Sequence, residues 1–168
     1  LSEATDYARQ LDPKSAEIEF LHAEIMHYSN APRTEVLIAY RNVLRLDPNH
    51  PRAMVGIAVM EYRKIGAPKA IALIERAIPQ FKTYERPYKG KSWMALCEML
   101  RYNGQFQLAV SKYEAAEKLN YMGTWSHFDR AAQLWHLNRK QEALKVWKQA
   151  RSRIKLGHPV GLSIFRNY

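Results

Sequence analysis

Six histidines are the first candidates for metal ligands in this chain. A zinc hydrolase needs a spacing such as His-Glu-x-x-His, which puts two imidazoles on one face of a helix. His22 and His27 are five residues apart, which takes them off a shared face. The others have no metal-ligand spacing either: His50, His127, His136 and His158. The sequence also has no glycine-rich phosphate loop and no Gly-x-Ser-x-Gly elbow, so we predict a non-enzyme without metal or cofactor.

Cys97 is the single cysteine, which excludes an internal disulfide. A reactive thiol needs exposure and a neighbour that lowers its pKa. Cys97 instead occupies a position that favours a small buried side chain, and we predict that it packs in the core. This leaves the compartment open. We expect a soluble protein and favour the cytoplasm over the periplasm.

Positive charge is a more informative feature than any single reactive residue. The formal net charge is +10, and it is unevenly distributed: residues 1–50 have a net charge of −3 and residues 51–168 a net charge of +13. Such an excess favours an acidic partner, which could be a protein segment, a nucleic acid, an anionic membrane surface or an acidic glycan. Head-to-tail self-association of the acidic start with the basic remainder is a further alternative.

Residues 79–90 interleave aromatic and basic side chains over a segment longer than a usual hairpin connection. Pro79 and Pro87 are predicted to interrupt helix there. The segment could hold an anionic ligand by stacking and charge, or it could be an ordinary surface loop with a one-turn helix extension. The residues of this candidate anion-binding loop are Lys82, Tyr84, Arg86, Tyr88 and Lys89.

The elements that position these residues are predicted from a repeated order of bulky and small side chains. One stretch shows it in full: Trp93, Leu96, Cys97, Leu100, Gly104, Ala109, Tyr113 and Ala116. The same slots recur 34 residues later, and also upstream in residues 20–48 and 55–77. A period of this length is typical of stacked helical hairpins, in which two short helices cross closely where side chains are small. Turns between helices are predicted at Gly66, Gly104 and Asn138, which tolerate positive φ.

The ordered slots resemble the tetratricopeptide repeat (TPR) over nearly the whole chain, although Glu24 and His127 depart from the pattern. The resemblance implies an all-α fold: an α-solenoid of stacked helix–turn–helix repeats wound into a right-handed superhelix. We expect a single repeat domain, cut from a longer protein, with no apolar run near the roughly 20 residues that span a bilayer. Its parts are a partial repeat (1–13), full repeats (16–49, 51–81, 90–122 and 124–156) and a C-terminal cap or truncated helix (158–168).

In the TPR family the first helix of each unit lines a concave face, along which peptides or partner helices lie. Carried over slot by slot, the resemblance implies a partner-binding groove formed by Tyr28, Met60, Arg63, Lys64, Lys91, Met94, Arg101, Tyr102, Trp125, Phe128 and Trp135. The alternative for the aromatic members is packing against neighbouring helices. Leu21 and Ile25 stand where a carboxylate clamp for chaperone tails needs Lys and Asn, so that function is not expected.

Three functional hypotheses follow. The first is a protein-interaction scaffold that binds a peptide or helix, acidic or otherwise, within a larger assembly. The second is binding of RNA or another anionic polymer. It is less favoured, because the equivalent positions on the first helix of each repeat hold Leu21, Gly56, Met94 and Phe128 rather than polar residues that could read RNA bases. The third is an envelope-associated scaffold for secretion or polysaccharide export.

Overall fold

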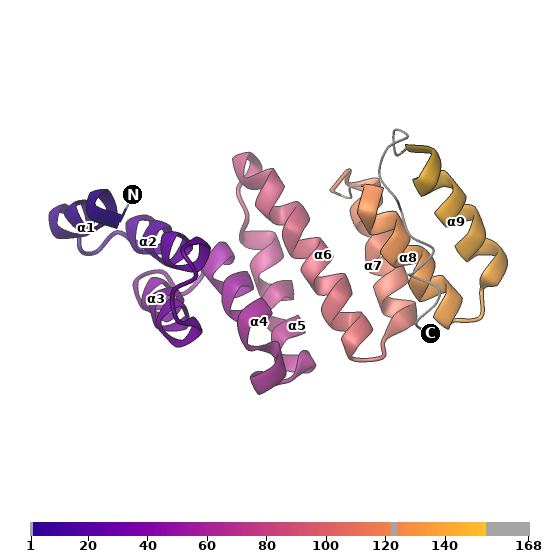
Figure 1. Cartoon of the computed structure of the whole chain (residues 1–168), viewed down its shortest axis with the longest axis horizontal. Helices are drawn as coiled ribbons and strands as arrows, with labels where there is room; N and C mark the ends of the chain where they lie inside the picture. Colours follow the sequence, from indigo (N-terminus) through magenta and orange to yellow (C-terminus); the bar gives the residue numbers. More distant parts are fainter. Residues whose placement is uncertain (1, 122–123, 154–168) are drawn as a thin grey trace. The chain divides into compact units, whose positions relative to one another are not determined.

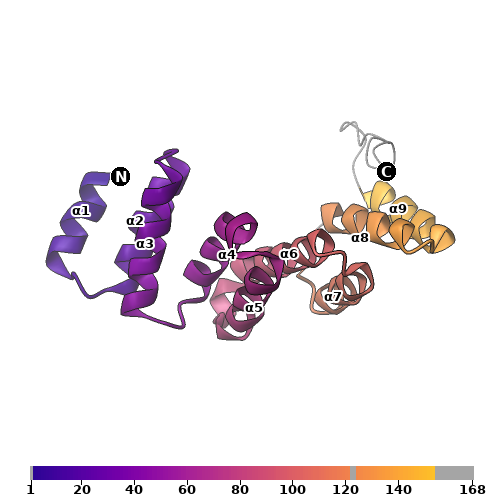
Figure 2. The ribbon, with the colours of Figure 1, turned by 90° about the horizontal axis from the view of Figure 1, so that it is seen from below.

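The computed structural model describes residues 2–121 and 124–153, apart from the side chains of Ser2, Thr124, Trp125 and Arg153. All regular structure in this part of the chain is helical (Figures 1 and 2), so the prediction of an all-α fold is confirmed. The elements are α1 (Ser2–Leu11), α2 (Ala16–Tyr28), α3 (Arg33–Leu46), α4 (Pro51–Ile65), α5 (Ala67–Ala77), the 3-10 turns η1 (Ile78–Gln80) and η2 (Thr83–Glu85), α6 (Arg86–Tyr102), α7 (Phe106–Lys118), α8 (Thr124–His136) and α9 (Lys140–Arg153).

Two compact units make up the chain, Leu1–Tyr88 and Lys89–Tyr168. The first contains α1 to α5 with the 3-10 turns, and the second contains α7 to α9 with most of α6. None of the helices in residues 2–121 and 124–153 is long and apolar enough to cross a membrane. The single continuous repeat domain stays a prediction, and the proposed cap at 158–168 lies outside the described residues.

Short turns with positive φ connect the helices of each hairpin. Gly66, Gly104 and Asn138 have φ of 82°, 70° and 59°, so the three predicted turns are confirmed. Asn30, between α2 and α3, and Asn120, after α7, also have a positive φ, of 57° each. Asparagine and glycine suit these positions because other side chains are strained in the left-handed region.

Small side chains lie at the helix crossings, as the repeat pattern predicts. In the first unit, Ala58 of α4 and Ala70 of α5 are both fully buried. In the second unit, Cys97 of α6 and Ala109 of α7 are also fully buried, which confirms the packing role predicted for the cysteine. Burial raises the pKa of the Cys97 thiol to about 12. The thiol is therefore protonated at neutral pH, as an inert core residue would be.

The predicted loop over residues 79–90 is shorter than expected. Pro79 lies in η1, but α6 already begins at Arg86 and contains Pro87 in its first turn. A first-turn N–H has no partner within the helix, so proline is tolerated there. The prediction that Pro87 interrupts helix is therefore wrong. The turn before α6 is closed by Glu85, whose carboxylate accepts a hydrogen bond from the Lys82 backbone N–H at 3.0 Å.

Candidate partner-binding surfaces

The first helices of the two full hairpins in the first unit, α2 and α4, carry exposed apolar and basic side chains. On α2, Leu21 and Tyr28 are 52% and 73% exposed, and their spacing of seven residues places them on one helix face. On α4, Arg63 and Lys64 are exposed, and Met60 is partly buried against the core. We call these five residues the α2/α4 face.

Tyr40 of α3 packs between these two helices. Its ring is buried, its hydroxyl donates a hydrogen bond to Glu24 Oε1 of α2 at 2.5 Å, and its Cζ atom would lie 2.9 Å from a Cβ placed on Gly56 of α4. Burial and the neighbouring Glu24 carboxylate together raise the pKa of Tyr40. This contact explains why a carboxylate occupies a repeat slot that usually holds a small residue. It also explains why α4 has a glycine in its interior.

Exposed candidates in the second unit lie along α6. Met94 and Tyr102 are 37% and 49% exposed, and Lys91 is exposed as well. The Arg101 guanidinium lies 4.4 Å from the Tyr102 ring centroid, and the Tyr102 hydroxyl donates to Glu98 Oε1 at 3.0 Å. This arrangement holds the arginine and the phenol next to each other on one surface.

The aromatic residues predicted on α8 have different outcomes. Phe128 is 1% exposed and meets the Trp147 ring of α9 edge-on, with centroids 6.4 Å apart. The prediction that Phe128 contacts a partner is therefore wrong, because its ring is part of the core. Trp135 is partly buried against the same core, with Lys140 Nζ 5.6 Å from its ring centroid. The Trp125 side chain lies outside the described part of the chain.

A second feature, which the repeat pattern did not indicate, is a cluster around Arg52 at the start of α4. Its guanidinium donates to Glu17 Oε1 of α2 and lies 4.3 Å from the Phe20 ring centroid. On the other side, Arg52 Nε is 3.1 Å from Glu85 Oε1, and the guanidinium is 5.0 Å from the Tyr88 ring centroid. One side chain thus joins α2, α4, η2 and the first turn of α6.

His50 completes this cluster as the N-cap of α4. Its Nδ1 accepts the Ala53 backbone N–H at 3.3 Å, so the neutral ring carries its proton on Nε2, which lies 3.4 Å from Glu17 Oε2. Burial lowers the pKa of His50, although the Glu17 carboxylate opposes the shift. The ring is therefore neutral at pH 7, and only the neutral ring can accept the capping hydrogen bond.

The Arg52 cluster borders a pocket of about 390 Å3, and two residues of the predicted anion-binding loop lie in its wall. Tyr84 is 75% exposed, and Lys82 Nζ lies 5.7 Å from its ring centroid. The other loop residues point to different surroundings: Tyr88 faces Arg52, Arg86 is exposed, and Lys89 Nζ is 5.9 Å from the Tyr121 ring centroid in the second unit. Only Lys82 and Tyr84 therefore form part of this pocket, and anion binding stays a prediction.

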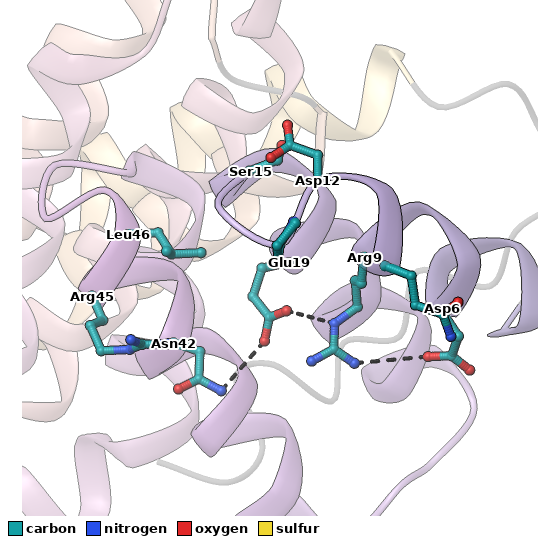
Figure 3. A pocket seen from close by; sticks show the side chains of 10 residues that line it. Asp6, Arg9, Asp12, Ser15, Glu19, Asn42, Arg45 and Leu46 are labelled. Carbon is teal, nitrogen blue, oxygen red and sulfur yellow. Dashed lines mark hydrogen bonds and ion pairs between the residues drawn. The ribbon is translucent and has the colours of Figure 1, made fainter.

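A larger polar pocket, of about 570 Å3, lies among α1, α2 and α3 (Figure 3). Glu19 of α2 is buried and lines this pocket, where Arg9 Nε lies 2.8 Å from Glu19 Oε2 and Asn42 Nδ2 donates to Glu19 Oε1 at 3.4 Å. Arg9 Nη1 is also 3.8 Å from Asp6 Oδ1 on α1 (Figure 3). These contacts satisfy the buried carboxylate and fix α1 against α2 and α3.

The described residues contain no arrangement of side chains that suggests a metal site. Within 2–121 and 124–153, no group of three or more His, Cys, Asp or Glu side chains is placed to hold a metal ion. His127, which departs from the repeat pattern, is buried with Nδ1 3.6 Å from Glu117 Oε1. His136 stacks on Phe106 with ring centroids 4.8 Å apart.

Comparison with known proteins gives matches in structure. No family model matches the sequence, and no curated protein matches it either. Among solved structures, YrrB, described as a TPR protein with an unusual peptide-binding site, aligns with a TM-score of 0.75 at 21% identity, covering 91% of this chain and 76% of its own. Two structures of MamA align with TM-scores of 0.72 and 0.71 at 15% and 14% identity, covering 90% and 94% of this chain and 85% and 87% of theirs. The chain therefore has a TPR-like fold of stacked helical hairpins.

Proposed function

We propose that this protein is an interaction scaffold and that the α2/α4 face binds a helix or extended peptide of a partner protein. The observation that carries the proposal is the exposure of Leu21 and Tyr28 on one side of α2. Large apolar side chains exposed side by side mark interaction surfaces, and tyrosine is over-represented among the residues that dominate binding energy. YrrB, described as a TPR protein with an unusual peptide-binding site, supports this proposal by analogy of fold.

The chemistry of the face indicates the kind of peptide. Leu21 and Tyr28 provide apolar contacts on α2, whereas Arg63 and Lys64 provide cations on α4. Arg63 Nε donates to the Tyr62 hydroxyl at 3.1 Å, and the guanidinium lies 5.8 Å from the Tyr62 ring centroid, so the positive charge is held at the surface of α4. The partner we propose is a peptide with an apolar anchor followed by acidic residues.

A matched pair of tyrosines tests this proposal. Peptides selected from a displayed random library on the wild-type protein would be titrated against Tyr28→Ser and Tyr84→Ser by isothermal calorimetry. Tyr28 and Tyr84 are 73% and 75% exposed in the same unit, but only Tyr28 lies on the α2/α4 face. We expect Tyr28→Ser to weaken binding at least about tenfold, because truncation of a central aromatic costs about 2 kcal/mol or more. Tyr84→Ser should leave it unchanged.

The opposite results would reject the proposal. If Tyr84→Ser weakens binding and Tyr28→Ser does not, the peptide binds beside the segment before α6. If neither substitution changes the affinity, the α2/α4 face is not the binding surface. Circular dichroism of both variants establishes that they remain folded.

Binding of an anionic polymer is the second candidate, favoured by Lys82 above the exposed Tyr84 ring. Stacking on an aromatic ring beside a cation suits a single-stranded nucleic acid. A fluorescent poly(U) oligonucleotide should then bind with an affinity that falls steeply with salt and that drops on Tyr84→Ser. Salt-independent or absent binding rejects this candidate.

A further inference from the structure

The outer face of α1 is apolar and carries one carboxylate, that of Glu3. Tyr7 and Leu11 are 63% and 70% exposed, and Glu3 is exposed four residues before Tyr7. A spacing of four residues places these three side chains on one side of the helix. Thr5, on the opposite side, is 4% exposed, and α1 packs against α2. We call Glu3, Tyr7, Gln10 and Leu11 the α1 face.

Alignment of α1 with α3, its equivalent in the next repeat, shows that two positions of α1 are less buried than the same positions of α3. Asp12-Pro13 after α1 matches Asp47-Pro48 after α3, a shift of 35 residues. At this shift Ala4 and Ala8 correspond to Ala39 and Val43, which are 4% and 0% exposed. Ala4 is exposed and Ala8 only partly buried. Apolar positions that are buried in the next hairpin are thus exposed to solvent on α1. Burying them against another surface would be favourable, because it removes apolar area from water.

The outer face of α9 has the complementary chemistry. Leu144 is 40% exposed and lies four residues from the exposed Lys140 and from the exposed Lys148, and Lys145, three residues before Lys148, is exposed as well. Arg151 is also exposed, one turn after Lys148, with its guanidinium 5.4 Å from the Trp147 ring centroid. Ala143, Val146 and Ala150 are buried on the other side of the helix. We call Lys140, Leu144, Lys145, Lys148 and Arg151 the α9 face.

Most acidic side chains of the second unit are held by arginines. Residues 89–168 contain fourteen Lys and Arg but five Asp and Glu. Glu142, the acidic residue of α9, receives hydrogen bonds from Arg139 at 2.7 and 2.6 Å. Glu114 and Glu117 both bind Arg130 at 2.8 Å. These pairings keep the carboxylates occupied and leave a net positive field over α9.

We propose that the protein self-associates head to tail, with the α1 face of one copy docked on the α9 face of the next. Leu144 would pack against Tyr7 and Leu11, and the lysines beside it would face Glu3 of the other copy. A second copy is the occupant that the chain itself supports, because each molecule carries one apolar face with a carboxylate on α1 and one apolar face with several cations on α9. The two faces differ, so the contact is heterologous and can add further copies. This inference is independent of the α2/α4 face.

Sedimentation velocity over a range of protein concentrations tests the proposal on the full chain. The wild type should form dimers and larger species as the concentration rises, and added salt should weaken them because exposed charges are screened. Lys145→Glu/Lys148→Glu should lower the association constant at least about tenfold, and so should Glu3→Lys/Gln10→Lys. The control Lys69→Glu/Lys118→Glu makes the same change in charge as Lys145→Glu/Lys148→Glu, but at two exposed lysines of α5 and α7. It should associate as the wild type does.

A mixing experiment distinguishes this arrangement from others. Each face variant retains one intact face, so an equimolar mixture should regain a dimer that neither variant forms alone. An interface formed by one face alone, α1 with α1 or α9 with α9, would not show this complementation, because one of the two variants would still dimerise by itself. The proposal is overturned if the wild type stays monomeric at every concentration, if the face variants associate as the wild type does, or if the mixture stays monomeric. An acidic partner of α9 other than a second copy would give the first of these results.

Discussion

The contact between Gly56 and Tyr40 predicts an unusual response to a helix-stabilising substitution. Replacing glycine by alanine inside a helix ordinarily stabilises a protein by about 1 kcal/mol. In α4, however, the new methyl group would lie 2.9, 3.0 and 3.1 Å from Cζ, Cε2 and Cε1 of the Tyr40 ring. These distances are shorter than carbon atoms tolerate, so the ring must move.

The ring has little freedom to move, which sets the magnitude. Tyr40 is 2% exposed and its hydroxyl is bonded to Glu24 at 2.5 Å, so a displacement disturbs both the core and that hydrogen bond. Overpacking a core costs about 1–3 kcal/mol, and a hydrogen bond to a charged group contributes about 1.5–3 kcal/mol. After subtraction of the helix-propensity gain of about 1 kcal/mol, we expect Gly56→Ala to lower the free energy of unfolding by about 1.5–5 kcal/mol, with the upper end reached if the hydrogen bond is lost.

Urea denaturation followed by circular dichroism at 222 nm measures this change, and a double-mutant cycle isolates its cause. In a Tyr40→Leu background the ring is absent, so Gly56→Ala should raise the free energy of unfolding relative to Tyr40→Leu alone. The reasoning is refuted if Gly56→Ala stabilises the otherwise wild-type protein. It is also refuted if the substitution has the same effect in both backgrounds.

Three further predictions concern burial. Phe128→Ala should lower the free energy of unfolding by about 3–5 kcal/mol, as measured by urea denaturation, whereas Met94→Ala at the repeat-equivalent exposed position should change it by less than about 0.5 kcal/mol; equal effects would contradict the core assignment. Burial lowers the pKa of His50 in the folded protein. As the pH falls below about 6.5, the ordinary histidine pKa, His50 is therefore protonated in the unfolded chain before it is protonated in the folded protein. Stability should therefore fall progressively below that pH, and thermal denaturation of His50→Asn, which keeps a capping side chain, should show less of this loss. Cys97 should react with a thiol reagent at pH 8 only in denaturant, and rapid modification of the native protein would contradict its burial.

The sequence predicted the helical hairpins well because their determinants are local. Glycine or asparagine in the left-handed region and small residues at crossings leave a direct pattern in the chain, as Gly104 and Cys97 do. The prediction for Phe128 was wrong because burial also depends on the size of the residue opposite. Met94 occupies the equivalent slot one repeat earlier and is 37% exposed, whereas Phe128 meets the large Trp147 ring.

The Arg52 cluster was missed because it joins residues far apart in the chain. Glu17 and Arg52 are 35 residues apart, about one repeat length. Opposite charges at equivalent positions of successive repeats, as in Glu17 and Arg52, are thus a signal in the sequence from which this ion pair could have been predicted. Glu85 and Tyr88, by contrast, belong to a segment that breaks the period, and no repeat register could place them beside Arg52.

Site-specific crosslinking tests the central proposal, that the α2/α4 face binds a partner peptide, most directly. A photoreactive amino acid would replace Tyr28 on α2 or, as the control, Ile38 on α3, which is 56% exposed. The proposal predicts that a library-selected peptide crosslinks at position 28 and not at position 38. Crosslinking at position 38 alone, or at neither position while the peptide still binds, would contradict it.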